Sequence, residues 1–508
     1  MDEAGGLSLI GKLAGAVGAS EAALKILISI LLAHPISLFH RYNLYGRNQD
    51  LQHIYFAVCG MAIGIFNYGW DIFHTLATVV VVYIVLKVAG GTLMSTIITL
   101  GFTMAYLLIG YYVTGTETYD IKWTMPECVL TLRLTGLAFD LYDGSKPVES
   151  LSAENKKVAL KEVPSFLEVL AHSYFPASFL VGPQFSMKRY QDFVSGKFRG
   201  SESGLPDCLG AAVSRSLTGV LYLALYQIGC LYFPDNYLVS EQFESLGILK
   251  RLFYMGIWGH VALYKYICIW LLCEGVCIEV GLTYNGDDEN GKPKWDGCAN
   301  VNLSKFEGAT IFTHYIESFN INTNHWVAQY IYKRLRFLGN KHLSQLGVLL
   351  FLAVWHGLHS GYYMCFFLEF VCLVMERDLQ AMLTRNKAVL QFLSQPGVSH
   401  LIWLLLKLYT LVFMVLYMLQ LQAMLTRNKA VLQFLSQPGV SHLTWLLLKL
   451  YTLVFMGYCM APFVLLSVHK WFTAFFNTFF IGHVVWMGWH AYRPLVKILL
   501  PPAKERTS

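Results

Sequence analysis

The sequence predicts an all-α fold, a polytopic bundle of transmembrane helices. Of the 508 residues, 55% are hydrophobic and only 14% are charged, and the mean hydropathy is +0.47. Soluble domains carry roughly 25% charged residues, and the long, continuous apolar stretches differ from the alternating strands of a membrane barrel. This composition excludes a soluble enzyme and a disordered protein. The net charge of +6 is too modest for a nucleic-acid partner.

The predicted spans follow apolar stretches of about 20 residues, the length that crosses a bilayer. They lie near 22–38, 53–69, 72–89, 92–114, 209–233, 252–283, 346–375, 401–420, 443–468 and 471–492. Two shorter stretches, 127–142 and 164–181, are interrupted by Arg133, Asp140, Pro176 and Gly182-Pro183, which favours re-entrant, amphipathic or partly buried helices. With about 11 spans and short polar connections, residues 1–508 are expected to form a single membrane domain.

A tandem duplicate interrupts this pattern near the C-terminus. Leu379–Met414 and Leu421–Met456 are identical except for Ile402 in place of Thr444. Lipid-facing helices accept most apolar residues, so they do not require such identity, and a repeat architecture needs at least three units. We therefore expect one copy to be superfluous.

The segment with the clearest chemical content is the apolar run Leu346–Val374. It contains Trp355-His356-Gly357-Leu358-His359-Ser360-Gly361-Tyr362. An ionisable side chain at membrane depth is expensive and usually marks function. His356 and His359 stand three apart, which predicts that they share one helical face. An equally good alternative is that both histidines bond backbone carbonyls and hold helices together. A metal site is disfavoured, because there is one His-x-x-His and no second cluster.

Upstream, three asparagines in Ser318–Trp326 precede an amphipathic basic segment that begins at Tyr330. An interfacial turn would explain this composition. The separation of Asn320 from His356 also allows a short helix, a turn and half a span, so the two side chains could converge. The cations of this region, Lys333, Arg334, Arg336 and Lys341, suit either a positive-inside anchor or a surface for phosphates.

These residues resemble the membrane-bound O-acyltransferase family. Its signature is a histidine deep in an apolar helix, preceded some three dozen residues earlier by an asparagine. The resemblance extends over nearly the whole chain and is strongest to the lysophospholipid acyltransferase branch. The segments that carry it are Ser318–Asn324, residues 355–362, Trp295-Asp296, Tyr264-Lys265-Tyr266 with Trp270, and Cys128–Gly144. The duplicate departs from the family pattern, which has a single copy.

The resemblance implies transfer of a fatty acyl group, expected to be polyunsaturated, from acyl-CoA to the sn-2 hydroxyl of lysophosphatidylcholine and related lysophospholipids. His356 would be the general base, since desolvation keeps a histidine neutral and able to accept the proton. Asn320 would orient the substrate or stabilise the oxyanion, and the sequence does not separate these roles. A covalent acyl-enzyme is disfavoured, because no Ser or Cys lies in an elbow motif. No metal and no cofactor are expected, as acyl-CoA is a co-substrate.

The family also implies a tunnel that meets at His356. Trp326, Trp355 and Tyr362 would line it, although such aromatics are more often core or interface residues, and Lys333 and Arg334 would bind the CoA phosphates. The expected location is the endoplasmic reticulum membrane, with acyl-CoA, a lysophospholipid from the bilayer and membrane lipids as partners; a homo-oligomer is left open.

Two other functions compete with this interpretation. An acyltransferase of the same fold could act on a sterol, diacylglycerol or a secreted peptide. A transporter would also show polar groups at membrane depth, but it typically has broken helices in two related halves.

Overall fold

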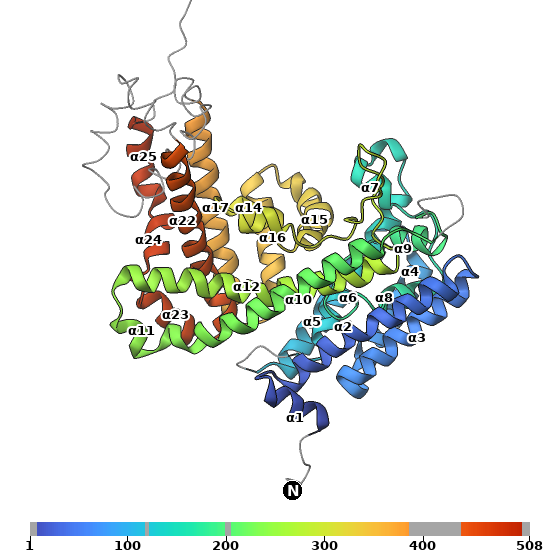
Figure 1. The fold of residues 1–508 in the computed structure, drawn as a ribbon. Coiled ribbons are helices and arrows are strands. Elements are labelled where there is room, and N and C mark those ends of the chain that lie inside the picture. Colours follow the sequence, from blue (N-terminus) through green and yellow to red (C-terminus); the bar gives the residue numbers. More distant parts are fainter. Residues whose placement is uncertain (1–7, 117–120, 199–204, 386–437, 500–508) are drawn as a thin grey trace, which may run out of the picture. The chain divides into compact units, whose positions relative to one another are not determined.

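A computed structural model describes residues 8–116, 121–198, 205–385 and 438–499 of the chain. Every named element within these ranges is a helix (Figure 1), so the all-α prediction is confirmed for the described residues. Six helical stretches among them are long and apolar enough to cross a membrane: Glu21–Leu44, Gln49–Ala89, Leu93–Thr114, Leu209–Val239, Ile248–Glu279 and Leu448–Leu465.

The chain divides into two compact units, which are described separately. The first comprises residues 1–226, 264–301 and 320–358, and the second comprises residues 227–263, 302–319 and 359–508. The helices of the first unit are α1 (Leu9–Ala16), α2 (Glu21–Phe39), the π-helix η1 (His40–Leu44), α3 (Gln49–Tyr68), η2 (Gly69–Asp71), α4 (Ile72–Ala89), α5 (Leu93–Thr114), α6 (Thr124–Gly144), η3 (Val148–Ser150), α7 (Ala153–Val158), α8 (Phe166–Ser173), α9 (Met187–Val194), α15 (Ile321–Val327), the π-helix η5 (Ala328–Tyr332), the 3₁₀-helix η6 (Lys333–Leu338) and α16 (Lys341–His356).

The second unit contains the remaining helices. They are η4 (Asp235–Val239), α11 (Glu241–Ser245), α13 (Leu303–Glu307), α14 (Phe312–Ser318), α17 (Ser360–Arg385), α22 (Pro438–Leu465), α23 (Val468–Phe476), α24 (Ile481–Met487) and α25 (Trp489–Leu499). Two long helices, α10 (Leu209–Tyr232) and α12 (Ile248–Glu279), contribute residues to both units.

Most predicted spans coincide with a helix. The ends of α2, α3, α4, α5, α10 and α12 differ from the predicted ends by at most four residues, and α22 covers most of the predicted 443–468. Local capping explains the largest early difference: the Asn48 side chain accepts hydrogen bonds from the backbone of Asp50 and Leu51, so α3 begins before its apolar run.

Two predicted spans are wrong. The run 346–375 is not one helix, because α16 ends at His356 and α17 begins at Ser360. The run 471–492 forms α23, α24 and the start of α25, because Phe479 and Phe480 adopt positive φ angles of 54° and 51° that interrupt a helix. The predicted span 401–420 and most of the first duplicate copy lie outside the described residues, whereas the end of the second copy lies in α22.

In the first unit, α6 is buried along nearly its whole length. Thr124–Gly144 packs against α4 and α5, which lie beside it (Figure 1), and its side chains contribute to a core that also contains α3 and α8. The crossing of α3 over the end of α8 is close, since a Cβ on Gly60 would lie 1.7 Å from the carbonyl oxygen of Tyr174. The predicted short helix at 127–142 is therefore a full, enclosed helix.

The second unit is built around α17 and α22, which lie side by side (Figure 1). Its core draws on α14, α23 and α24 and on the first part of α12. Gly259 of α12 meets Gly457 of α22 so closely that a Cβ on Gly259 would lie 2.2 Å from the Gly457 Cα. Small residues at such crossings are typical of helix packing in membranes.

Candidate active site

His356 is the last residue of α16. Gly357 follows with φ 139° and ψ −167°, a conformation essentially restricted to glycine. Its N–H still donates to the carbonyls of Ala353 (3.3 Å) and Val354 (3.2 Å), so the helix is closed immediately after the histidine. The structure thus places His356 at a helix end rather than in mid-span.

The end of α16 at His356 shows that the prediction of a shared helical face for the two histidines is wrong. Because the helical backbone stops at Gly357, His356 and His359 do not share a helical face. His359 lies between α16 and α17, and the two histidines belong to different units. A His-x-x-His spacing defines a shared face only where the intervening residues are helical.

Trp355 is held by two helices of the first unit. Its indole Nε1 donates to the carbonyl of Cys128 in α6 (2.9 Å), and its own carbonyl accepts from the Tyr111 hydroxyl in α5 (3.2 Å). The ring is buried and meets the His356 imidazole edge to face, with 4.7 Å between centroids. These contacts anchor the end of α16, and the predicted contact between Trp355 and substrate stays a prediction.

Asn320 stands immediately before α15 in the left-handed conformation, with φ 52° and ψ 45°. Asparagine tolerates this region better than most residues. Its carbonyl accepts from the Asn324 N–H (3.0 Å), but its side chain does not cap the helix. Instead, Asn320 Oδ1 accepts from Asn300 Nδ2 at 3.3 Å. The side chain is half-buried and lies in the same unit as His356; their convergence stays a prediction.

The other predicted aromatic residues are buried. Trp326 stacks on Phe351 of α16, with 5.7 Å between ring centroids, and its Nε1 has no hydrogen-bond partner among the described residues. Tyr362 meets Phe463 edge to face at 5.0 Å within the second unit. Their role as tunnel walls is a prediction that these contacts neither test nor exclude.

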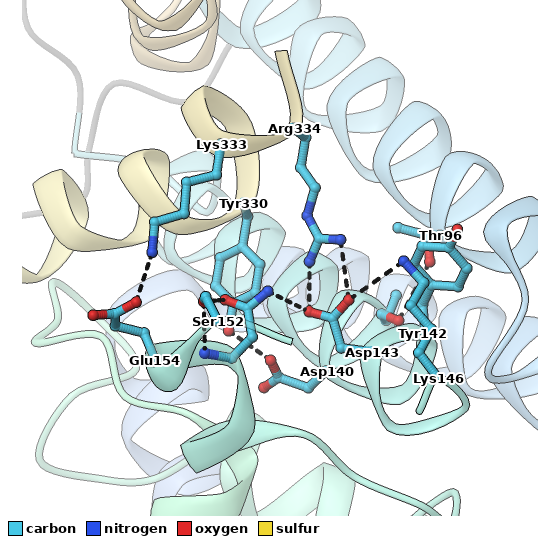
Figure 2. A network of polar contacts seen from close by, with 12 residues as sticks. Thr96, Asp140, Tyr142, Asp143, Lys146, Ser152, Glu154, Tyr330, Lys333 and Arg334 are labelled. Atoms are coloured by element: carbon cyan, nitrogen blue, oxygen red, sulfur yellow. Dashed lines mark hydrogen bonds and ion pairs between the residues drawn. The ribbon is translucent and has the colours of Figure 1, made fainter. Parts of the chain in front are cut away.

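Figure 2 shows where Lys333 and Arg334 lie. Lys333 Nζ donates to Glu154 Oε2 (2.8 Å) in an exposed pair, and this bond lowers the pKa of the Glu154 carboxyl. Arg334 bonds both oxygens of Asp143, with its Nη1 at 3.0 Å and its Nη2 at 2.5 Å. Lys333 thus points to the surface, whereas Arg334 is bound to a buried carboxylate.

The rest of this network connects η5 with α6 and α7. The Tyr330 hydroxyl donates to Asp140 Oδ1 (2.6 Å), and Asn155 Nδ2 donates to Asp143 Oδ2 (2.8 Å). Lys146 lies 3.8 Å from Asp143 Oδ1. The segment between Asn320 and His356 is therefore tied to the buried helix α6.

Sequence reasoning missed several residues that support this site. Asn300 and Tyr111 carry no signal in a single sequence, because they are separated from Asn320 and Trp355 by many residues. In the sequence, Asp140 stands out only as a charged residue that interrupts a short apolar stretch. The sequence does not identify Tyr330 as the partner of Asp140.

Comparison with known proteins places the part of the chain that contains these residues in a family. The sequence model of MBOAT, the membrane-bound O-acyltransferase family, matches residues 108–419. That range contains Asn320, His356 and every other predicted site residue. This chain belongs to the membrane-bound O-acyltransferase family.

This chain is also similar to curated members of the family, over about half to nearly all of their length. The chain is 41% identical to the lysophospholipid acyltransferase 5 of Mus musculus over 98% of this chain and 93% of that relative. It is 43% identical to the lysophospholipid acyltransferase 5 of Drosophila melanogaster over 80% of this chain and 82% of that relative. It is 34% identical to the lysophospholipid acyltransferase of Schizosaccharomyces pombe over 53% and 54%, respectively. As a member of the family, the chain is a membrane-associated acyltransferase.

Proposed function

We propose that this acyltransferase transfers a fatty acyl group, by preference polyunsaturated, from acyl-CoA to the sn-2 hydroxyl of lysophosphatidylcholine and related lysophospholipids. The observation that best supports this is the similarity to proteins named lysophospholipid acyltransferase 5 over 98% of the chain. The position of His356 at a closed helix end, beside a buried tryptophan, adds a geometric argument.

In the proposed reaction, a neutral His356 takes the proton from the lysophospholipid hydroxyl as its oxygen attacks the thioester carbon. The new C–O bond gives a tetrahedral intermediate whose oxyanion requires a preorganised donor. Collapse breaks the C–S bond, and the leaving CoA sulfur takes up the proton from His356. Atoms and charge balance without a metal or a cofactor, and both of these absences stay predictions.

The CoA phosphates require cations that are accessible. Lys333 meets this need, because its pair with the exposed Glu154 is of the kind that is worth little in water. Arg336 and Lys341 are exposed, and no ion pair is recorded for either within the described ranges. Arg334 would have to leave the buried Asp143 to bind a phosphate. We therefore assign Lys333, Arg336 and Lys341 to this surface ahead of Arg334.

The number of spans, the tunnel, the routes of the substrates and the cellular location are proposed from membership of the family alone. We propose about 11 spans around a tunnel that ends at His356, with Trp326, Trp355 and Tyr362 on its walls. Acyl-CoA would enter from the cytosol and the lysophospholipid from the bilayer of the endoplasmic reticulum, where the multi-pass chain would reside. A homo-oligomer is left open.

One copy of the duplicate is proposed to be superfluous. Deleting Leu379–Gln420 joins Asp378 to Leu421, so the residues that complete α17 are replaced by an identical Leu-Gln-Ala-Met-Leu-Thr-Arg. The end of the second copy, in α22, is kept. We expect the deletion protein to insert and to retain activity; a well-expressed but inactive deletion protein would make the extra copy a working part.

The test of function is an acceptor comparison. Membranes containing the chain are supplied with radiolabelled polyunsaturated acyl-CoA and, in separate reactions, lysophosphatidylcholine, diacylglycerol, cholesterol or a secreted peptide. We expect label only in phosphatidylcholine. Label in another acceptor would favour a different acyltransferase of the same family.

Two variants relate the reaction to His356. His356→Ala should lower the rate by about 10²–10⁴-fold, the usual contribution of a general base, and His359→Ala should cost far less. Equal losses in the two variants, at equal expression and detergent-solubilised size, would contradict the assignment of His356 as the base.

A further inference from the structure

The amide of Asn320 has a defined orientation, which backbone groups determine. The N–H of Asn322 can only donate, and it donates to the side chain of Asn300 at 3.0 Å. The accepting atom must therefore be Asn300 Oδ1. This leaves Asn300 Nδ2 toward Asn320, at 3.3 Å.

The same rule about donors and acceptors fixes the orientation of the Asn320 amide. An amide nitrogen cannot accept a hydrogen bond, so the group of Asn320 that faces Asn300 must be its oxygen. Asn320 Nδ2 then points away from Asn300, and it takes part in no hydrogen bond recorded within the described residues. Asn320 thus offers a donor from a half-buried position.

Asn300 is itself rigidly placed. Its N–H donates to Glu274 Oε1 (2.6 Å), and its carbonyl accepts from the Ile321 N–H (3.0 Å). Glu274 Oε2 in turn accepts from Arg215 Nε (2.6 Å), and Arg215 Nη2 donates to the Val301 carbonyl (2.7 Å). Asn300 and Glu274 are each 2% exposed, so the bond between them is shielded from water.

The side chain of Asn320 bonds Asn300 and does not cap the helix that follows it. An asparagine that precedes a helix normally turns its oxygen to the first backbone N–H groups, and Asn320 does not. The left-handed backbone costs some strain and directs the side chain to Asn300 instead. A strained residue whose oxygen is already bound presents its N–H₂ group to whatever approaches.

We infer that Asn300 is a positioning residue that turns the Asn320 amide so that its Nδ2, a hydrogen-bond donor, faces the reacting acyl carbonyl oxygen. This rests on the proposed acyl transfer and separates the two roles that the sequence left open for Asn320. A donor stabilises the oxyanion that forms when the hydroxyl attacks; an acceptor would destabilise it.

Three variants test the orientation. Asn320→Asp keeps the acceptor for Asn300 and removes the donor. Asn300→Asp keeps the acceptor for the Asn322 N–H, but it forces Asn320 to turn its Nδ2 inward and its oxygen outward. Asn300→Ala removes the restraint, so both orientations of Asn320 become populated. The matched control is Asn302→Asp, the same change at a position that caps α13 through its oxygen.

The expected order of the kcat losses distinguishes a positioning role of Asn300 from a purely structural one. Asn320→Asp and Asn300→Asp should each lower kcat by about 10²-fold or more, the usual cost of losing one oxyanion donor, with unchanged KM for acyl-CoA and lysophosphatidylcholine. Asn300→Ala should lower kcat less than Asn300→Asp, and Asn302→Asp should match the parent protein. A structural role predicts the reverse order for Asn300, since Ala removes more contacts than Asp.

Each outcome decides the question. If Asn320→Asp keeps kcat within about fivefold, or if Asn300→Ala is the more damaging change at Asn300, the inference is overturned. If Asn300→Asp does not fold, as judged by its melting temperature in detergent, Asn320→Asp and Asn300→Ala decide: a large kcat loss in the first with a smaller one in the second supports the inference. If the parent protein acylates no lysophospholipid, the proposed function has failed instead.

Discussion

Helices α4 and α6 are neighbours in the first unit and follow opposite rules. Apolar side chains such as Ile84 (55% exposed) and Val88 (83% exposed) cover the outer face of α4. In α6, Glu127, Arg133 and Asp140 are each at most 3% exposed. The more polar helix is therefore the more deeply buried one. In a membrane protein apolar surface can face lipid, whereas a polar group must find a partner inside the protein.

The largest expected effect tests the pair that α6 makes with η6. Asp143→Leu leaves Arg334 without its carboxylate and should lower the free energy of unfolding by about 3 kcal/mol, the lower end of the cost of breaking a buried pair, because the Arg334 side chain is 26% exposed and water can still reach it. The double variant Asp143→Leu/Arg334→Leu should recover most of this loss, as judged by denaturation in detergent micelles. If Asp143→Leu is as stable as the parent protein, the polar groups of α6 do not depend on partners inside the protein.

A smaller effect is expected for the central cation of α6. Arg133 Nη1 donates to the carbonyls of His172 (2.7 Å) and Ser173 (3.2 Å), and its Nη2 donates to Ser178 Oγ (3.0 Å). Arg133→Met leaves these acceptors buried and unpaired and should cost about 2–3 kcal/mol.

Lys87→Met on the exposed side of α4 is the matched control for Arg133→Met, and it should stay within about 0.5 kcal/mol of the parent. Denaturation in the same detergent measures both. Equal losses would mean that the charge on α6 is no better partnered than a surface charge on α4.

Tyr330→Phe removes a single hydrogen bond to α6. The hydroxyl donates to Asp140 Oδ1, so its loss should cost about 1–2 kcal/mol. The control is Tyr332→Phe, because the structure records no hydrogen bond for the Tyr332 hydroxyl in the described part of the chain. Thermal denaturation that does not distinguish the two variants would contradict the assigned role of Tyr330.

The smallest effect is expected on the lipid face. Ile84→Ala should change the stability in a bilayer by less than about 0.5 kcal/mol, because lipid chains occupy the space that the side chain leaves. Leu86→Ala, which is fully buried two residues away, should cost about 2–5 kcal/mol. Similar values for the two, measured in lipid nanodiscs, would show that this face of α4 does not contact lipid.

The same contrast explains which parts of the fold could be predicted. Hydropathy detects surface that lipid covers, so α4 was predicted at both ends. Arg133 and Asp140 were recognised as breaks in an apolar stretch, but the groups that make α6 a complete helix lie in α8 and η5. A single sequence does not reveal such distant partners.

The candidate site shows the same division. His356 could be predicted because an ionisable group in an apolar run is conspicuous. The break after it could not, since glycine is common in membrane helices and only the structure gives Gly357 its φ of 139°. Asn300 lies in a polar connection whose composition is ordinary, and its importance depends on the backbone N–H of Asn322.

The pairing of Asp143 with Arg334 also sets an order of events during synthesis. The two residues are 191 positions apart, which at about 5–20 residues per second corresponds to about 10–40 s of translation. Throughout that interval α6 carries a carboxylate that hydrocarbon does not accept. We expect α6 to stay accessible to water until η5 and η6 emerge. A nascent chain arrested before Ala328 should therefore react at Cys128 with a membrane-impermeant thiol reagent, and a chain arrested after His356 should be protected.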